Sequence, residues 1–155
     1  MPRIANNIII AFVSFIFLQV GSLYADVSYT IKVKNTEFIG AVEKEKGEEK
    51  TISFVGIPFA KPPVEDLRWK APRELDQLPN TFDATTLPNR CMQVSNFYDE
   101  MDGIEGGSIV GSEDCLYLNI YLSEKAYNSK EKLPVMFWIH GGGNTWGYSA
   151  SNLFT

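Results

Sequence analysis

The sequence predicts a protein of the α/β class, and three observations support this prediction. Residues 135–139 (VMFWI) form an unbroken apolar run, which is typical of a strand buried on both faces of a sheet. Residues 27–33 and 116–122 alternate apolar and polar side chains, as half-buried strands do. The apolar run ends in the sequence HGGG at residues 140–143. α/β proteins bind ligands at this kind of junction, beyond the carboxyl end of a strand.

The composition of the 155-residue chain fits a globular protein and disfavours several classes of function. Its 45% hydrophobic and 13% aromatic residues predict a packed core. The 14 basic and 19 acidic residues give a net charge of −5 without a basic block, so neither nucleic acid nor an anionic membrane is an expected partner. One histidine and two cysteines are too few for a structural zinc site, and no cofactor is expected.

Residues 1–25 predict a signal peptide, and the protein is therefore expected to be secreted. Arg3 is the only charged residue among them, and an apolar core follows at residues 8–20. This core suits a signal peptide and is shorter than the roughly 20 residues of a transmembrane helix. Cleavage is expected after Ala25, with cleavage after Ser22 as the alternative. A buried helix or a signal anchor is the other interpretation of the segment.

The two cysteines of the chain, Cys91 and Cys115, are predicted to form a disulfide in an oxidising compartment. The loop that they close has 25 residues, counting both ends. A loop of this length predicts a stabilisation of about 3–4 kcal/mol on the chain-entropy model. Two buried free thiols are the alternative.

A β meander is predicted at the start of the mature chain. Residues 27–33 form its first strand, residues 38–42 belong to a short second strand, and residues 51–57 form the third. The charged sequence EKEKGEEK at residues 43–50 predicts a solvated turn between the second and third strands.

The middle of the chain is predicted to contain little regular structure. Six prolines between residues 58 and 88 exclude a long helix and restrict any strand to an edge. Four glycines between residues 103 and 111 predict an extended loop with at most a short helical turn. Residues 116–122 return to regular structure as a strand, and residues 123–133 form a polar connection to the apolar run.

The three consecutive glycines at residues 141–143 carry a chemical implication. Without side chains, consecutive N–H groups can turn toward one point and a substrate can approach the backbone closely. Such an arrangement binds a developing negative charge. A surface loop is the ordinary interpretation of a triple glycine, but the predicted buried strand before it and the sequence HGGG favour an oxyanion loop.

The chain resembles type-B carboxylesterases, the cholinesterase-like branch of the α/β-hydrolases. The matching segments are residues 54–69 (FVGIPFAKPPVEDLRW), residues 112–122 (SEDCLYLNIYL) and residues 133–143 (LPVMFWIHGGG), together with the cysteine and glutamine of residues 91–93 (CMQ). The resemblance implies an incomplete α/β-hydrolase fold. Residues 26–155 would supply only the N-terminal β meander and the first strands of the central sheet.

The resemblance also implies roles for individual residues. Gly142 and Gly143 match two oxyanion-hole donors, and Gly141 would shape the turn before them. Arg68 and Glu113 match a buried structural ion pair. Cys91 and Cys115 match the first disulfide of the family, and His140 matches a structural position that is not the general base.

Three features depart from the family pattern. Glu65 stands where glycine is usual in the sequence PPVG, so this turn is expected to differ. Asn144 replaces the usual phenylalanine after the glycines. The loop between Cys91 and Cys115 lacks the tryptophan that holds choline in cholinesterases, which disfavours acetylcholine as the substrate.

The sequence lacks the G-x-S-x-G motif that carries the nucleophile in this family. The partial matches at Ser108 and Ser149 both lack the last glycine. Residues 1–155 alone are therefore expected to be inactive and to be part of a longer serine esterase that hydrolyses small carboxylic esters through an acyl-enzyme. A catalytically inactive cholinesterase-like adhesion or binding domain is the alternative, and a small secreted binding module is a third interpretation.

Overall fold

The computed structural model describes residues 28–46, 49–101, 103–129 and 131–149. The predicted signal peptide, both candidate cleavage sites and Gly47 lie outside the described residues. Within these ranges no helix is long and apolar enough to cross a membrane.

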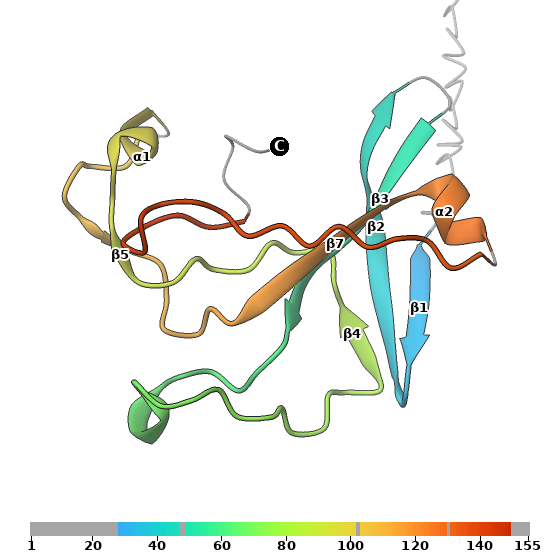
Figure 1. Ribbon diagram of the computed structural model, residues 1–155, viewed down its shortest axis with the longest axis horizontal. Coiled ribbons are helices and arrows are strands. Elements are labelled where there is room, and N and C mark those ends of the chain that lie inside the picture. Colours follow the sequence, from blue (N-terminus) through green and yellow to red (C-terminus); the bar gives the residue numbers. More distant parts are fainter. Residues whose placement is uncertain (1–27, 47–48, 102, 130, 150–155) are drawn as a thin grey trace, which may run out of the picture.

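A mainly antiparallel sheet occupies the centre of the structure (Figure 1). Its strands lie in the order β1 (Tyr29–Val33), β2 (Thr36–Lys46), β3 (Glu49–Pro58) and β7 (Tyr117–Ser123). The predicted meander and the strand after the second cysteine are thereby confirmed. β2 and β3 differ from the prediction because they extend through most of the predicted solvated turn, with Lys46 opposite Glu49. Main-chain hydrogen bonds hold this extension together, and they do not depend on side-chain polarity.

A short strand within the proline-rich stretch completes the sheet. β4 (Thr81–Asp83) pairs in parallel with β2, while the same stretch holds only one turn of 3-10 helix, η1 (Glu65–Leu67). The N–H of Ala84 donates to the carbonyl of Ile39, and the carbonyl of Ala84 accepts from the N–H of Val55, both at 2.8 Å. This segment therefore bridges β2 and β3 through Ala84.

The buried core lies on the meander and the strand segments next to it. Ile52 and Phe54 on β3 are 0% and 1% exposed, respectively. The ring of Phe54 packs directly on β2 at Gly40, where an added Cβ would lie 2.7 Å from a ring carbon. The rest of the core consists of Tyr29, Phe38 and Ala84, with Ile31, Ile57, Leu78, Phe82, Leu122 and Tyr127 packed around them.

A short helix after β7 closes one end of the core, although residues 123–133 were predicted as a polar connection. This helix, α2 (Glu124–Asn128), begins at Ser123, whose hydroxyl accepts a hydrogen bond from the N–H of Ala126 at 3.1 Å. Tyr127 packs edge-on against Tyr29 with 5.1 Å between ring centroids, and its hydroxyl donates to the carbonyl of Thr30 at 2.8 Å. The helix is thus held by its N-cap, by the contact between Tyr127 and Tyr29, and by hydrogen bonds to β1.

The segment between the cysteines forms a small substructure of its own. β5 (Gln93–Val94) pairs antiparallel with β6 (Ile109–Val110), and α1 (Phe97–Met101) lies between them in the chain. The predicted short helical turn is confirmed. Ser95 on the β5 side is held to the β6 side, because its N–H and hydroxyl donate to the carbonyls of Ser108 and Glu105.

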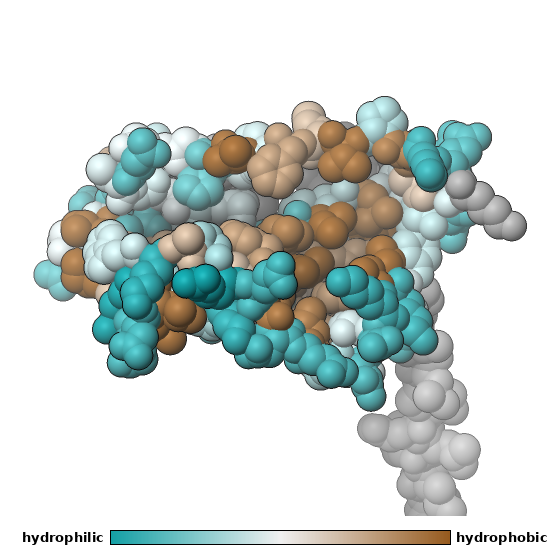
Figure 2. Space-filling view, turned by 60° about the horizontal axis from the view of Figure 1, so that its bottom comes forward, coloured by the Kyte–Doolittle hydropathy of each residue, from teal (hydrophilic) through white to brown (hydrophobic). Residues whose placement is uncertain are grey.

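The prediction of a buried strand at residues 135–139 is wrong for the structure described. This segment is extended but forms no strand, and Val135, Met136 and Phe137 are 89%, 91% and 80% exposed. An apolar run becomes a buried strand only where other strands and helices cover it. In the described part of the chain no layer does so, and Figure 2 shows apolar side chains exposed across one face of the molecule, bordered by hydrophilic ones.

Candidate oxyanion loop

The three consecutive glycines open a tight loop after the extended apolar segment. Gly142, Gly143 and Asn144 have φ angles of 125°, 59° and 60°. The carbonyl of Gly142 accepts hydrogen bonds from the N–H groups of Thr145 at 3.1 Å and Trp146 at 3.3 Å, and from the Thr145 hydroxyl at 3.0 Å. Positive φ angles at successive residues turn the backbone sharply, and asparagine tolerates this conformation better than most residues.

The N–H groups of Gly142 and Gly143 are not used in closing this loop. Neither donates a hydrogen bond to another residue that the structure describes. The N–H groups of Thr145 and Trp146, by contrast, both donate hydrogen bonds inside the loop. The loop therefore holds two adjacent backbone donors available for an acceptor from elsewhere.

The glycines differ in how closely the structure surrounds them. A Cβ at Gly142 would lie 1.7 Å from the carbonyl oxygen of Trp146, and a Cβ at Gly147 would lie 2.5 Å from that of Gly141. A Cβ at Gly143 would have no atom within 4 Å, and the same holds for Gly141, whose φ is not in the left-handed region. Gly142 and Gly147 are needed for the loop to close, whereas Gly143 leaves open space above the backbone.

The single histidine of the chain lies against the loop that it precedes. Nδ1 of His140 is 2.7 Å from the carbonyl oxygen of Gly141 and close to Gly147. Ser108 and Ser149, the two serines of the partial nucleophile motifs, make their hydrogen bonds elsewhere. The Ser108 hydroxyl donates to the carbonyl of Glu105, and that of Ser149 accepts from Asn119. The described residues thus do not assemble a serine–histidine pair.

Gln93 contacts the loop from β5, and the sequence analysis assigned no role to this residue beyond its place in the CMQ match. Its side-chain Oε1 accepts a hydrogen bond from the N–H of Gly147 at 2.6 Å, and its Nε2 donates to the carbonyl of Gly147 at 3.2 Å. Figure 1 shows the loop as a red trace beside β5, the strand that carries Gln93. Nothing in the local sequence signals this contact, because the partners are 54 residues apart.

The predicted disulfide between Cys91 and Cys115 is present in the structure, with an S–S distance of 2.02 Å. Its first cysteine lies two residues before Gln93, and its second lies two residues before β7. The disulfide therefore ties the segment that contacts the glycine loop to the central sheet.

A buried ion pair lies next to the disulfide. The Arg90 guanidinium pairs with the Asp99 carboxylate at the start of α1, and the two side chains are only 11% and 5% exposed. Arg90 also stacks over the ring of Tyr148, 4.8 Å from its centroid. Burial raises the pKa of Asp99, whereas the hydrogen bonds from Arg90 and from the N–H of Asn96 lower it. The lowering effects together are larger, so the pKa of Asp99 lies below its ordinary value.

Arg68 and Glu113 are in contact, but at the surface rather than in the buried position that the resemblance implies. Nε and Nη2 of Arg68 each lie 2.5 Å from a carboxylate oxygen of Glu113, while the side chains are 46% and 39% exposed. Hydrogen bonding to the partner raises the pKa of Arg68 and lowers that of Glu113. The pair joins η1 to the loop before β7, and no further layer of the described chain covers it.

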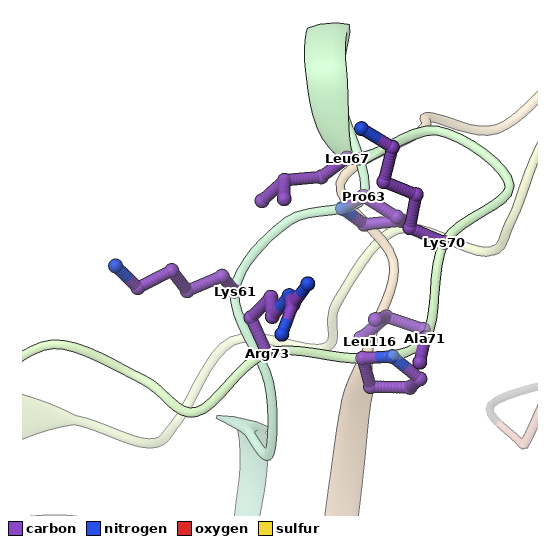
Figure 3. Close-up of a pocket in the computed structure, with 8 residues that line it drawn as sticks. Lys61, Pro63, Leu67, Lys70, Ala71, Arg73 and Leu116 are labelled. Atoms are coloured by element: carbon purple, nitrogen blue, oxygen red, sulfur yellow. The ribbon is translucent and has the colours of Figure 1, made fainter.

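Near this ion pair, the proline-rich stretch and the start of β7 enclose a small cavity of about 140 Å³ (Figure 3). Lys61, Lys70 and Arg73 stand around it, and Lys61 forms an ion pair with Asp76 at 2.6 Å. No residue of the glycine loop lines this cavity. It is also smaller than the ~300–1,000 Å³ of ordinary ligand pockets. Among the described residues there is no group of three potential metal ligands.

Comparison with known proteins identifies the family. The model of the carboxylesterase family matches residues 27–154, which is most of the chain. The chain belongs to the carboxylesterase family.

Individual carboxylesterases align with the same part of the chain. An acetylcholinesterase of Leptinotarsa decemlineata is 39% identical over 115 residues, which is 65% of this chain and 18% of that protein. A juvenile hormone esterase of Tribolium castaneum is 38% identical over 122 residues, or 79% of this chain and 19% of that protein. The chain thus spans about a fifth of the length of these carboxylesterases.

A solved esterase structure identifies the fold as that of an α/β-hydrolase. This thermophilic PNB esterase matches with a TM-score of 0.62 at 30% sequence identity. The match covers 81% of this chain and 24% of that one. The partial sheet with few helices is therefore an incomplete α/β-hydrolase fold, as predicted.

Proposed function

We propose that the protein is a serine esterase that hydrolyses small-molecule carboxylic esters, and that Gly142 and Gly143 are its oxyanion-hole donors. The family match supports ester hydrolysis in general. One observation supports the site in particular: the loop closes on the carbonyl of Gly142 while the N–H groups of Gly142 and Gly143 stay available. Both lie where Gly143 leaves room for a substrate to approach.

The proposed reaction begins with attack by a serine hydroxyl on the ester carbonyl, while a histidine takes the hydroxyl proton. The carbonyl electron pair moves to oxygen, and the two glycine N–H groups stabilise the resulting oxyanion. The alcohol then leaves with a proton delivered by a histidine, and water hydrolyses the acyl-enzyme by the same steps. Residues 1–155 contain no G-x-S-x-G motif and one histidine, and the described serines do not contact His140, so we assign none of these residues as the serine, the acid or the catalytic histidine. No metal or organic cofactor is required.

The test of this proposal is the variant Gly143→Ala in the protein expressed from its complete reading frame. Alanine would disfavour the φ of 59° and place a methyl group in the space used by the substrate. We expect kcat for p-nitrophenyl butyrate to fall about 10²–10³-fold, as on loss of an oxyanion donor, with a smaller change in KM.

The matched control is Gly107→Ala, because Gly107 has a φ of 80° and also has no atom near an added Cβ. Its kcat should stay at the wild-type value. An unchanged kcat in Gly143→Ala would remove this glycine from the oxyanion hole. A wild-type protein that hydrolyses no ester would instead indicate the catalytically inactive adhesion or binding domain.

We also propose that the protein is secreted. The apolar leader at residues 1–25 supports this, and so does the disulfide, which persists mainly in oxidising compartments. The same expression provides the test. Recovery from the medium with Asp26 or Leu23 at the N-terminus would support secretion, and an intracellular product that retains Met1 would contradict it.

A further inference from the structure

The amide of Gln93 satisfies both backbone polar groups of Gly147, as a neighbouring strand would. Oε1 accepts from the Gly147 N–H at 2.6 Å, and Nε2 donates to the Gly147 carbonyl at 3.2 Å and to the Cys91 carbonyl at 3.0 Å. The side chain is buried, with 8% of the residue exposed. Only one orientation of the amide places its acceptor at the Gly147 N–H and its donor at the Gly147 carbonyl. The two hydrogen bonds therefore fix the amide relative to the backbone of Gly147.

Gly147 in turn is packed against the beginning of the glycine loop. A Cβ at Gly147 would lie 2.5 Å from the Gly141 carbonyl oxygen and 2.7 Å from Nδ1 of His140. A Cβ at Gly142 would lie 1.7 Å from the carbonyl oxygen of Trp146. The two ends of the loop therefore touch each other, and a group that holds Gly147 also limits where Gly142 can lie.

Gln93 is itself anchored more firmly than the loop. It pairs with Val110 in the β5–β6 ladder, and it lies two residues from the disulfide at Cys91. Arg90, on the other side of that cysteine, is fixed by its buried ion pair with Asp99 and covers the ring of Tyr148. Residues 90–93 thus hold residues 147 and 148 at two adjacent points.

We infer that Gln93 is a positioning residue for the candidate oxyanion hole. Its side-chain amide holds Gly147 and thereby limits where the backbone of Gly142 and Gly143 can lie. The inference rests on the proposed function for its effect on catalysis, but the contact itself can be measured separately. Glutamine is suited to this role because one side chain supplies a donor and an acceptor together.

The experiment uses the variant Gln93→Met in the protein expressed from its complete reading frame. Methionine keeps the length of the side chain but removes both hydrogen bonds to Gly147. We expect kcat to fall about 10–10²-fold with KM changed less than about threefold, because small displacements of catalytic groups are costly mainly in the transition state. Amide hydrogen exchange at Gly147 should become at least tenfold faster.

Two further variants make the result specific. Gln77→Met is the control, because Gln77 is exposed in the proline-rich stretch and should change neither quantity. Gln93→Glu keeps the acceptor and loses the donor, so it should also lower kcat, and it serves if the methionine variant does not fold. A purely structural role would lower the amount of folded enzyme, measured by active-site titration, without lowering kcat per titrated site.

Each outcome decides the inference. Faster Gly147 exchange together with a lower kcat supports it. Faster exchange with an unchanged kcat, or unchanged exchange in Gln93→Met, overturns it, and for Gln93→Glu, which keeps the acceptor for the Gly147 N–H, an unchanged kcat overturns it. If the wild-type protein hydrolyses no ester, the proposed function fails, and the exchange at Gly147 alone decides whether Gln93 holds the loop.

Discussion

Apolar side chains of the β meander and those of the segment at residues 133–139 are opposite in burial. Ile52 on β3 is 0% exposed, whereas Ile139 is 76% exposed. The difference lies in neighbours: Ile52 has strands on both sides, β2 and β7, while residues 133–139 join no sheet in the described chain. Hydrophobicity therefore predicts which residues can be buried, and the strands that pair and the layers that cover them determine which ones are.

The largest expected effect contrasts the two isoleucines directly. Ile52→Ala should lower the free energy of unfolding of the 155-residue chain by about 4 kcal/mol, because it removes a fully buried side chain and leaves a cavity. Ile139→Ala should change it by less than about 0.5 kcal/mol. Urea unfolding followed by far-UV circular dichroism measures both values. An equal loss in the two variants would show that residues 133–139 are buried in solution.

The next effect contrasts two arginine–carboxylate pairs. Asp99→Asn should cost about 3 kcal/mol, because it leaves the buried Arg90 without its counter-charge. Glu113→Gln should cost clearly less, because the pair with Arg68 is half exposed. Urea unfolding at pH 7 tests both, and a larger loss for Glu113→Gln would contradict the burial of the two pairs.

The same pair predicts a pH dependence. Because the pKa of Asp99 is lowered on folding, its contribution to stability is present above its ordinary pKa of about 4 and is lost as the pH falls through the lower, folded value. The difference in unfolding free energy between wild type and Asp99→Asn should therefore narrow below about pH 4. A constant difference down to pH 3 would contradict the shift.

The smallest effect is a stabilisation. Glu65 has a φ of 48°, in the region that glycine prefers, although the residue is glutamate. Glu65→Gly should therefore raise the free energy of unfolding by about 0.5–1 kcal/mol. Glu74→Gly, at an exposed residue of the same stretch without a positive φ, should lower it by a similar amount. If the free energy of unfolding changed in the same direction in both variants, backbone strain at Glu65 would not be the cause.

Elements stabilised by their own residues could be predicted from the sequence, and elements that depend on distant contacts could not. Alternation at residues 27–33 and 116–122 predicted β1 and β7, because a half-buried strand needs only a period of two. β4 escaped prediction because its three residues form a strand only through pairing with β2. α2 was missed as well, although Ser123 could have signalled its N-cap, because its attachment comes from Tyr127 packing on Tyr29.

The candidate site divides in the same way. The glycines at 141–143 and the disulfide followed from short sequence patterns and the resemblance, and the positive φ angles at Gly142 and Gly143 fit the prediction of a sharply turned loop. The contact between Gln93 and Gly147 could not be predicted, because it joins two segments through a side chain and a backbone without any local signature.

The pairing of β3 has a consequence for synthesis of the chain. One edge of β3 pairs with β2, which precedes it in the chain. The other edge pairs with β7, and Leu122, the partner of Ile52 on β7, is synthesised 70 residues after Ile52. At ribosomal rates of about 5–20 residues per second this interval lasts roughly 4–14 seconds. The unpaired N–H and C=O groups of an open strand edge can pair with non-native segments, and prolines lack the N–H needed for such pairing. The six prolines between residues 58 and 88 leave the segment that emerges next with fewer N–H groups that could pair with that edge before β7 is made.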